Sequence, residues 1–176
     1  RFLLTVAVPY PRGNEEFEIL RRMSVQPPEA RQILNPDVVL RLQEQASQVF
    51  VHNLVAEYVV RLVLATRTPA EFGLADLAPI IQIGASPRAT LGLVAASRAL
   101  ALIHGRDYVL PTDVQAVAKD VMAHRLVLSF DAVADNISPL QVVERIVAMV
   151  PAPTPVWNDA SRQQARQQHR YTPEPP

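Results

Sequence analysis

The sequence predicts a mainly α-helical chain, which begins with one strand and one helix from the end of an α/β core and finishes in a disordered tail. Three observations predict this. Residues 2–8 form a short apolar run, residues 35–150 are a series of capped segments with helical spacing of apolar side chains, and residues 151–176 are rich in Pro, Gln and Arg. With 176 residues and 49% hydrophobic content, the chain can bury a sizeable core.

The N-terminal run FLLTVAV has the short length and β-forming side chains of a buried strand, and prolines close it. Asn14 is predicted to cap a helix that has two glutamates in its first turn. A lone strand leaves its backbone hydrogen bonds unpaired, so the rest of the sheet is expected upstream of Arg1. The absence of an initial Met also suggests a fragment or a processed chain. Residues 1–24 are therefore predicted to be the last strand and helix of a larger core.

Residues 25–150 are predicted to form an all-α domain, separated from the core by a linker that contains two consecutive prolines. Helix starts are predicted at five polar positions: Asn35, Asn53, Ser86, Thr112 and Ser138. Gly105 is predicted to end the longest helix, Ser86 to Ile103. The runs Ile80–Ile83 and Leu126–Phe130 are short enough for strands, although the first could equally be packed coil.

Composition excludes several classes of function. Seventeen basic residues balance seventeen acidic ones, so a dominant electrostatic grip on nucleic acid or on an acidic membrane is not expected. Cysteine is absent and the four histidines have no ligand spacing, so no metal site is predicted. No apolar segment is long enough to span a membrane and no signal peptide is present, so a cytoplasmic protein is expected.

The chemically informative string is Ser86-Pro87-Arg88, at the predicted start of the longest helix. No glycine-rich loop followed by Gly-Lys occurs in the chain, so phosphate binding must use arginines or helix N-termini. An arginine at the positive end of a helix dipole is explained if an anion lies in front of it. The alternative is that Arg88 bends into solvent, or pairs with Asp107 or Asp113.

This string also carries a family resemblance. Gly84–Ala89, GASPRA, resembles the sensor-2 motif of the MoxR family of AAA+ ATPases. Other segments resemble family motifs in the same order, over about residues 1–130. Arg1-Phe2-Leu3 resembles the end of the LDRF motif, and Tyr10-Pro11 with the acidic helix resembles the segment after that motif. Tyr58–Arg67 resembles the first long lid helix, and Ala99–Leu126 resembles the signature that ends in HRL. The resemblance implies the tail of an ATPase core followed by the helical lid.

What the family does is then an expectation for this chain. Ser86, Pro87 and Arg88 would contact bound nucleotide as sensor 2, and Arg1 would be an arginine finger that acts on the neighbouring subunit's nucleotide. The full-length protein would use ATP and Mg²⁺, form a homo-oligomeric and usually hexameric ring, and remodel or mature other proteins, von Willebrand A-domain proteins among them. Walker A and Walker B motifs are missing here, so the segment alone should not hydrolyse ATP.

A second reading is a stand-alone helical interaction module, with Thr112 to His124 as a DNA-recognition helix in a helix-turn-helix or histone-like fold. Two aspartates in that helix and the zero net charge argue against it. Three further predictions concern basic residues. Arg67 is predicted to cap its helix or to have a hinge or nucleotide-side role. Arg106 and Asp107 are predicted to be ion-pairing residues of a loop, and His124-Arg125 to cap a helix end, with a catalytic pair as the alternative.

Overall fold

The computed structural model describes residues 2–24, 27 and 29–154. Within these ranges the chain is mainly helical and has one sheet of two short strands. The elements in chain order are α1 (Gly13–Met23), α2 (Pro36–Gln48), α3 (Asn53–Ala65), the 3₁₀ helices η1 (Pro69–Phe72) and η2 (Ala75–Leu77), β1 (Ile81–Ile83), α4 (Pro87–Ile103), α5 (Pro111–Met122), η3 (Ala123–Arg125), β2 (Val127–Leu128), α6 (Phe130–Ala134) and α7 (Pro139–Met149).

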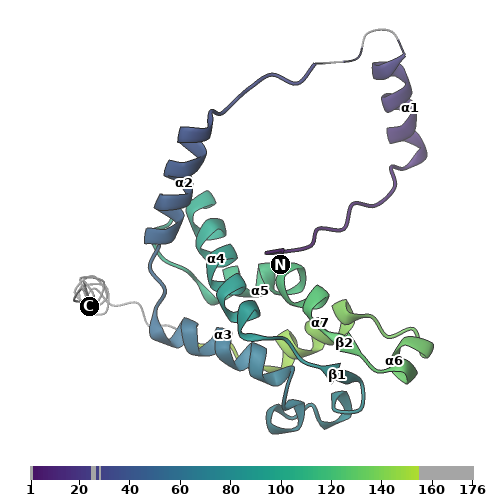
Figure 1. Ribbon diagram of the computed structural model, residues 1–176, viewed down its shortest axis with the longest axis vertical. Coiled ribbons are helices and arrows are strands. Elements are labelled where there is room, and N and C mark those ends of the chain that lie inside the picture. Colours follow the sequence, from purple (N-terminus) through teal and green to yellow (C-terminus); the bar gives the residue numbers. More distant parts are fainter. Residues whose placement is uncertain (1, 25–26, 28, 155–176) are drawn as a thin grey trace.

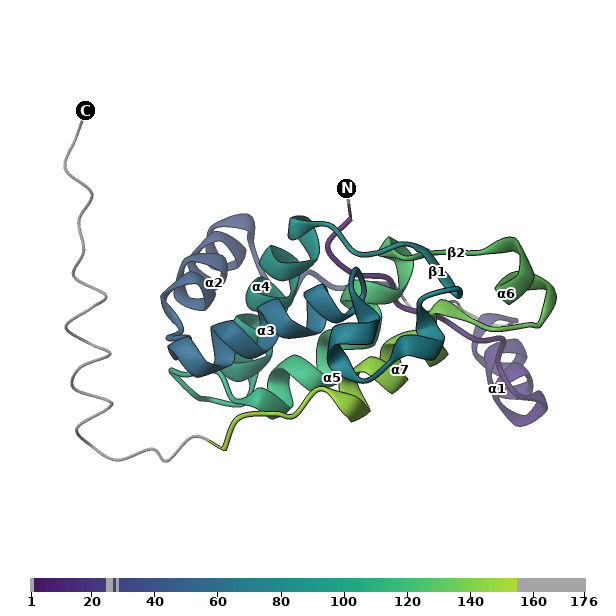
Figure 2. The ribbon, with the colours of Figure 1, turned by 90° about the horizontal axis from the view of Figure 1, so that it is seen from below.

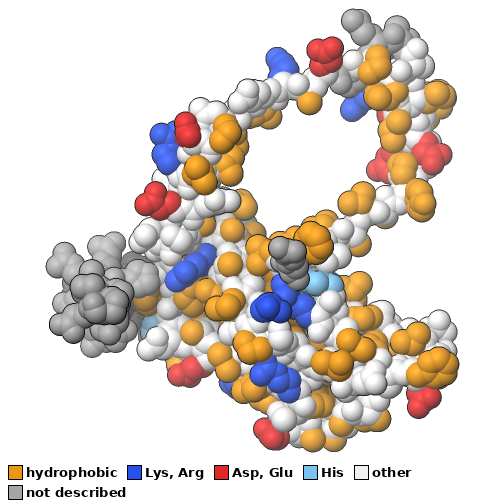
Figure 3. Space-filling view, in the orientation of Figure 1, with side chains coloured by type: hydrophobic (Ala, Val, Ile, Leu, Met, Phe, Trp, Pro, Cys, Tyr) orange, Lys and Arg blue, Asp and Glu red, His pale blue; other side chains and the backbone are white. Residues whose placement is uncertain are grey.

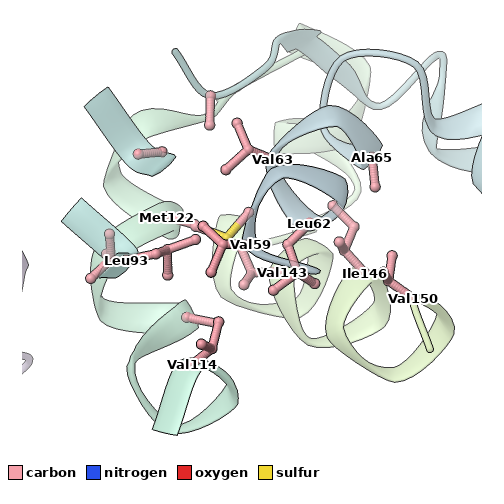
Figure 4. Close-up of a cluster of buried hydrophobic side chains, with 14 of the residues drawn as sticks. Val59, Leu62, Val63, Ala65, Leu93, Val114, Met122, Val143, Ile146 and Val150 are labelled. Carbon is pink, nitrogen blue, oxygen red and sulfur yellow. The ribbon is translucent and has the colours of Figure 1, made fainter. Parts of the chain in front are cut away.

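Helices α3, α4, α5 and α7 form a packed body, and α2 lies along α4 at its edge (Figures 1 and 2). The core is a cluster of aliphatic side chains that all four helices contribute (Figure 4). Its buried members include Leu62 from α3, Leu93 from α4, Val114 and Met122 from α5, and Ile146 from α7. Because these helices are far apart in the sequence, the body forms only when all of them come together.

Three predicted helix starts are confirmed. The Asn35 side chain accepts a hydrogen bond from Val38 N at 2.9 Å, and the Ser138 hydroxyl accepts one from Gln141 N at 3.2 Å. Each of these caps is followed by a proline at the first helical position, where its missing N–H costs nothing. Gly105, with φ of 70°, follows the end of α4 as predicted.

Three predicted helix starts are wrong. Thr112 lies inside α5, which begins at Pro111 after the N-cap Leu110, and Asn14 and Asn53 are not caps either. Asn14 lies inside α1, which begins at Gly13 after the N-cap Arg12, and the Arg12 amide donates to the Glu15 carboxylate at 2.7 Å. His52 rather than Asn53 caps α3, because its ring Nδ1 accepts a hydrogen bond from Leu54 N. An imidazole nitrogen can take the role of the usual carboxamide or hydroxyl oxygen.

The two short apolar runs do form strands. β1 and β2 pair antiparallel, with Ile81 opposite Leu128 and an irregularity in the register beside it. The ladder fixes the exit of β1, from which the chain passes directly into the turn that starts α4. The pairing of β1 with β2 therefore positions the Ser86-Pro87-Arg88 string that follows β1.

The N-terminal segment differs from the prediction. Residues 2–8 run extended but form no strand within the described ranges, and their only recorded backbone hydrogen bond joins Thr5 N to Asp120 O at 2.9 Å. A strand requires a neighbouring strand, and none lies beside this run. Val8 and Tyr10 are almost fully exposed, and α1 buries no side chain. In Figure 1 this segment and α1 form an arc that returns to the body through α2.

Residues 151–154 continue from α7 without helix or strand, and the rest of the predicted tail lies outside the described residues. No helix in the described part of the chain combines the length and the apolarity needed to cross a membrane.

Candidate functional site

The start of α4 is a helix end without a side-chain cap. Ser86 occupies the N-cap position in extended conformation and Pro87 follows at the first helical position, as predicted. Unlike Ser138 at the start of α7, Ser86 makes no side-chain cap hydrogen bond. Pro87 has no N–H and Ala89 N donates to the Ser86 carbonyl at 2.8 Å, so the Arg88 amide is the first-turn group that a side-chain cap would otherwise satisfy, and such a group favours an anionic ligand.

The turn before α4 is held by the end of α3. Ala85 N donates to the hydroxyl oxygen of buried Thr66 at 2.9 Å, and Arg67 Nε donates to Ala85 O at 2.7 Å. Gly84 passes so close that a β-carbon there would lie 2.5 Å from Thr66 O. These contacts fix the backbone that leads into Ser86.

The prediction that Arg67 caps its own helix is therefore wrong. Its side chain does not cap α3 but reaches across to the Ala85 carbonyl, 18 residues further along the chain. Sequence reasoning missed Thr66 altogether. The sequence feature that could have indicated this role is a Thr-Arg pair at the end of an apolar helix. The neighbouring sequence does not show that both residues face a turn 18 or 19 residues away.

Arg88 is exposed in the first turn of α4, and no hydrogen bond or ion pair is recorded for its side chain within the described residues. The predicted alternative, a pair with Asp113, is not formed, because Arg106 occupies both carboxylate oxygens of that residue at 2.6 and 2.7 Å. The predicted ion pairing of Arg106 is thereby confirmed, with Asp113 of α5 as its partner. Arg88 remains available to an anion at a helix end where a cation is otherwise unfavourable.

Arg88 lines a hollow of about 650 Å³ together with Arg125 and three residues of α4. Phe2 and Leu3 form its other side, and Figure 3 shows basic side chains gathered on the body beside the N-terminal end. The lining residues are Phe2, Leu3, Arg88, Leu91, Gly92, Ala95 and Arg125. The lining has no carboxylate, and the Arg125 guanidinium already donates to three backbone carbonyls, so Arg88 supplies the cation that suits a phosphate-bearing ligand.

The same donor set does not suit a divalent cation, which prefers several oxygen ligands. Within the described ranges, no group of three or more His, Asp and Glu residues could hold a metal ion. We therefore assign contact with Mg²⁺ to none of the described residues. Arg1, the predicted arginine finger, lies outside the described residues, although Phe2, which follows it, lines the hollow.

The helix that could recognise DNA, Thr112 to His124, does not have the exposed face that DNA binding requires. α5 packs against α4 on one side and α7 on the other. Its exposed face is narrow and carries a single cation, Lys119, which pairs with Glu144 of α7 at 2.9 Å. A helix that recognises bases in the major groove of DNA needs an exposed face with several hydrogen-bond donors.

Comparisons with known proteins agree with this geometry. Residues 75–146 match the family model of the AAA lid domain. The chain is 52% identical over 153 residues to Chaperone MoxR1 of Mycobacterium tuberculosis, which covers 87% of this chain and 41% of that protein. It is 42% identical over 102 residues to Protein MoxR of Paracoccus denitrificans, covering 54% of this chain and 30% of that protein. The crystal structure of a candidate ATPase from Cytophaga hutchinsonii superposes with a TM-score of 0.82 at 35% identity, covering 88% of this chain and 47% of that one. The chain thus spans less than half the length of these relatives.

Proposed function

Since the chain belongs to the MoxR family of AAA+ ATPases and contains their AAA lid domain, we propose that its helical body is the nucleotide-sensing lid of a longer ATPase. The observation that carries this proposal is the exposed, unpaired Arg88 at the uncapped start of α4. Ser86 and Pro87 place the backbone amide of Arg88, and the Arg88 side chain supplies a permanent charge whose planar fork can bind two phosphate oxygens. Thr66 and Arg67 hold the turn so that these groups keep one geometry.

The remaining parts of the proposal concern the whole protein. Residues 1–24 would complete the ATPase core, and Arg1 would reach a neighbouring subunit's nucleotide in a homo-oligomeric, usually hexameric, ring. ATP hydrolysis with Mg²⁺ would take place on that core, and closure of the lid would report which nucleotide is bound. A relative named as a chaperone supports a role in remodelling other proteins, for which von Willebrand A-domain proteins are candidate partners.

The test is Arg88→Ala in the full-length protein. Loss of a charge-assisted contact to phosphate, worth about 1.5–3 kcal/mol, should weaken ATP affinity and lower turnover roughly ten- to hundredfold. Nucleotide binding by fluorescence and phosphate release under saturating ATP measure the two effects. The matched control is Arg61→Ala, which removes the same charge from an exposed position on α3 and should change neither quantity.

Unchanged affinity and turnover in Arg88→Ala would overturn the sensor-2 assignment. The alternative function, a DNA-binding helical module, is tested by duplex binding at low salt with the same purified protein. Strong, salt-dependent binding would favour that alternative, because phosphate contacts dominate such affinity.

A further inference from the structure

Arg125 is the side chain that joins the N-terminal segment to the helical body. Its Nη2 donates to Phe2 O at 2.7 Å and to Leu3 O at 3.0 Å, while its Nε donates back to Val121 O at 2.8 Å. The bond to Val121 agrees with the predicted helix-end cap. The bonds to Phe2 and Leu3 cross more than 120 residues of sequence and were not predicted.

Two other contacts close the same junction. Thr5 N donates to Asp120 O at 2.9 Å, so residues 2–5 lie along the end of α5. At Gly92 a β-carbon would lie 3.5 Å from a Leu3 methyl, 3.0 Å from Val121 and 3.6 Å from Arg125 Nη2. The absence of a side chain at Gly92 lets the segment and α5 both approach α4.

Beyond residue 5 the segment leaves the body. Val6 is 65% exposed and Val8 is 88% exposed, and α1 buries no side chain. The attachment of this segment to the body is thus concentrated at the junction around Arg125.

We infer that Arg125 is a positioning residue, which fixes the backbone next to Arg1 relative to the helix that carries Arg88. Arg125 and Arg88 line the same hollow, and Phe2 is bonded to Arg1 through one peptide link. The inference rests on the proposed function: if Arg1 acts on a neighbour's nucleotide and Arg88 on the subunit's own, Arg125 links the residue that follows Arg1 to the body that carries Arg88.

The chemistry of the junction calls for arginine. One guanidinium reaches three carbonyl oxygens on two separate segments because its donors point in fixed, different directions. A lysine ammonium at the end of a flexible stem can keep part of this set, so Arg125→Lys should retain part of the function.

The experiment uses Arg125→Ala, Arg125→Lys and Arg1→Ala in the full-length protein, with Arg61→Ala as the matched control. A misplacement of about 1 Å in a catalytic group costs roughly 10²-fold in rate. We expect Arg125→Ala to lower kcat at least tenfold with an unchanged ATP dissociation constant, Arg125→Lys to lie between it and wild type, and Arg61→Ala to match wild type. Adding Arg125→Ala to Arg1→Ala should give no further loss.

Hydrogen exchange, measured in addition to activity, distinguishes loss of this junction from misfolding of the whole variant. In Arg125→Ala the amide of Thr5 should exchange with solvent at least tenfold faster, while amides in the interior of α3 remain protected as in wild type. Unchanged exchange at Thr5, or rate losses that multiply in the double variant, would overturn the inference. Normal turnover of Arg1→Ala would instead refute the arginine-finger part of the proposed function, and it leaves the exchange result as a separate test of the junction.

Discussion

Asp113 is the only buried carboxylate among the described residues, and its surroundings explain its ionised state. Both of its oxygens accept hydrogen bonds from Arg106, and Leu110 N donates a further one at 2.8 Å. Burial alone would raise the pKa of Asp113, but the Arg106 guanidinium and the Leu110 amide together hold that pKa below its ordinary value. The pair ties the loop after α4 to the start of α5.

Replacing Asp113 should lower the free energy of unfolding more than replacing a charged residue on the surface. Asp113→Ala leaves a half-buried Arg106 and the Leu110 amide without their acceptor, so we expect a loss of about 1.5–3 kcal/mol in the free energy of unfolding. Urea denaturation measures it. Glu144→Ala, which breaks the exposed pair with Lys119, is the control and should move the midpoint little.

The Arg106–Asp113 pair also predicts how the free energy of unfolding changes at acid pH. Because the folded pKa of Asp113 is lowered, its contribution is present above the pKa of the unfolded carboxyl, about 3.9, and is lost as the pH falls towards the folded value. The difference between wild type and Asp113→Ala should therefore be constant near neutral pH and shrink below about pH 4. A difference that stays constant as the pH falls well below about 4 would contradict this assignment.

At the scale of elements, α4 and α7 both begin at a Ser-Pro pair, yet only one of these serines caps its helix. Ser138 accepts a hydrogen bond from Gln141 N, and the Gln141 side chain accepts one from Ser138 N at 2.8 Å, which closes a capping box. Ser86 makes no such bond. The first turn of α7 is therefore closed by a side chain, whereas α4 begins without a side-chain cap.

This contrast is measurable. Ser138→Ala should cost about 1 kcal/mol in the free energy of unfolding, because the first turn of α7 loses its acceptor. Ser86→Ala should cost less than about half of that, since no cap bond is removed. Urea titrations of the two variants side by side provide the comparison. Equal losses would indicate that the Ser86 hydroxyl caps α4 in solution.

At the scale of the whole molecule, the chain divides into a body that has a core and an arc that has none. The aliphatic cluster of α3, α4, α5 and α7 is fully buried (Figure 4). By contrast, no described side chain between residues 2 and 34 is buried, and Figure 3 shows hydrophobic side chains exposed along this arc. Such exposure is expected of a surface that packs against another part of a longer protein.

The body should therefore fold without the arc. A variant that begins at Asn35, the cap of α2, should keep the urea midpoint of the whole chain, because apolar burial sets the stability and no removed residue belongs to the buried core. A fall in midpoint as large as that of Ser138→Ala would show that residues 2–5, through their junction with α5, stabilise the body.

Local patterns in the sequence are enough to predict much of this protein. Polar caps followed by proline located the starts of α2, α4 and α7, and Gly105 located the end of α4, because each satisfies or ends a helix through its own backbone. The same reasoning placed Arg88 in the first turn of α4. Where two residues compete for one cap, as His52 and Asn53 do, the pattern was too degenerate to choose.

The sequence by itself determined the helical class and the position of Arg88, since both follow from hydrogen bonds and spacings within a few residues. Only the tertiary structure decided what surrounds that arginine. Thr66 and Arg67 hold its turn from 18 or 19 residues away, and Arg125 holds the N-terminal segment from 122 or 123 residues away. Folding brings these groups together by burying a shared core, and no local spacing encodes such contacts. For the same reason residues 2–8 have the composition of a strand, but without a neighbouring strand in the described chain they remain extended and unpaired.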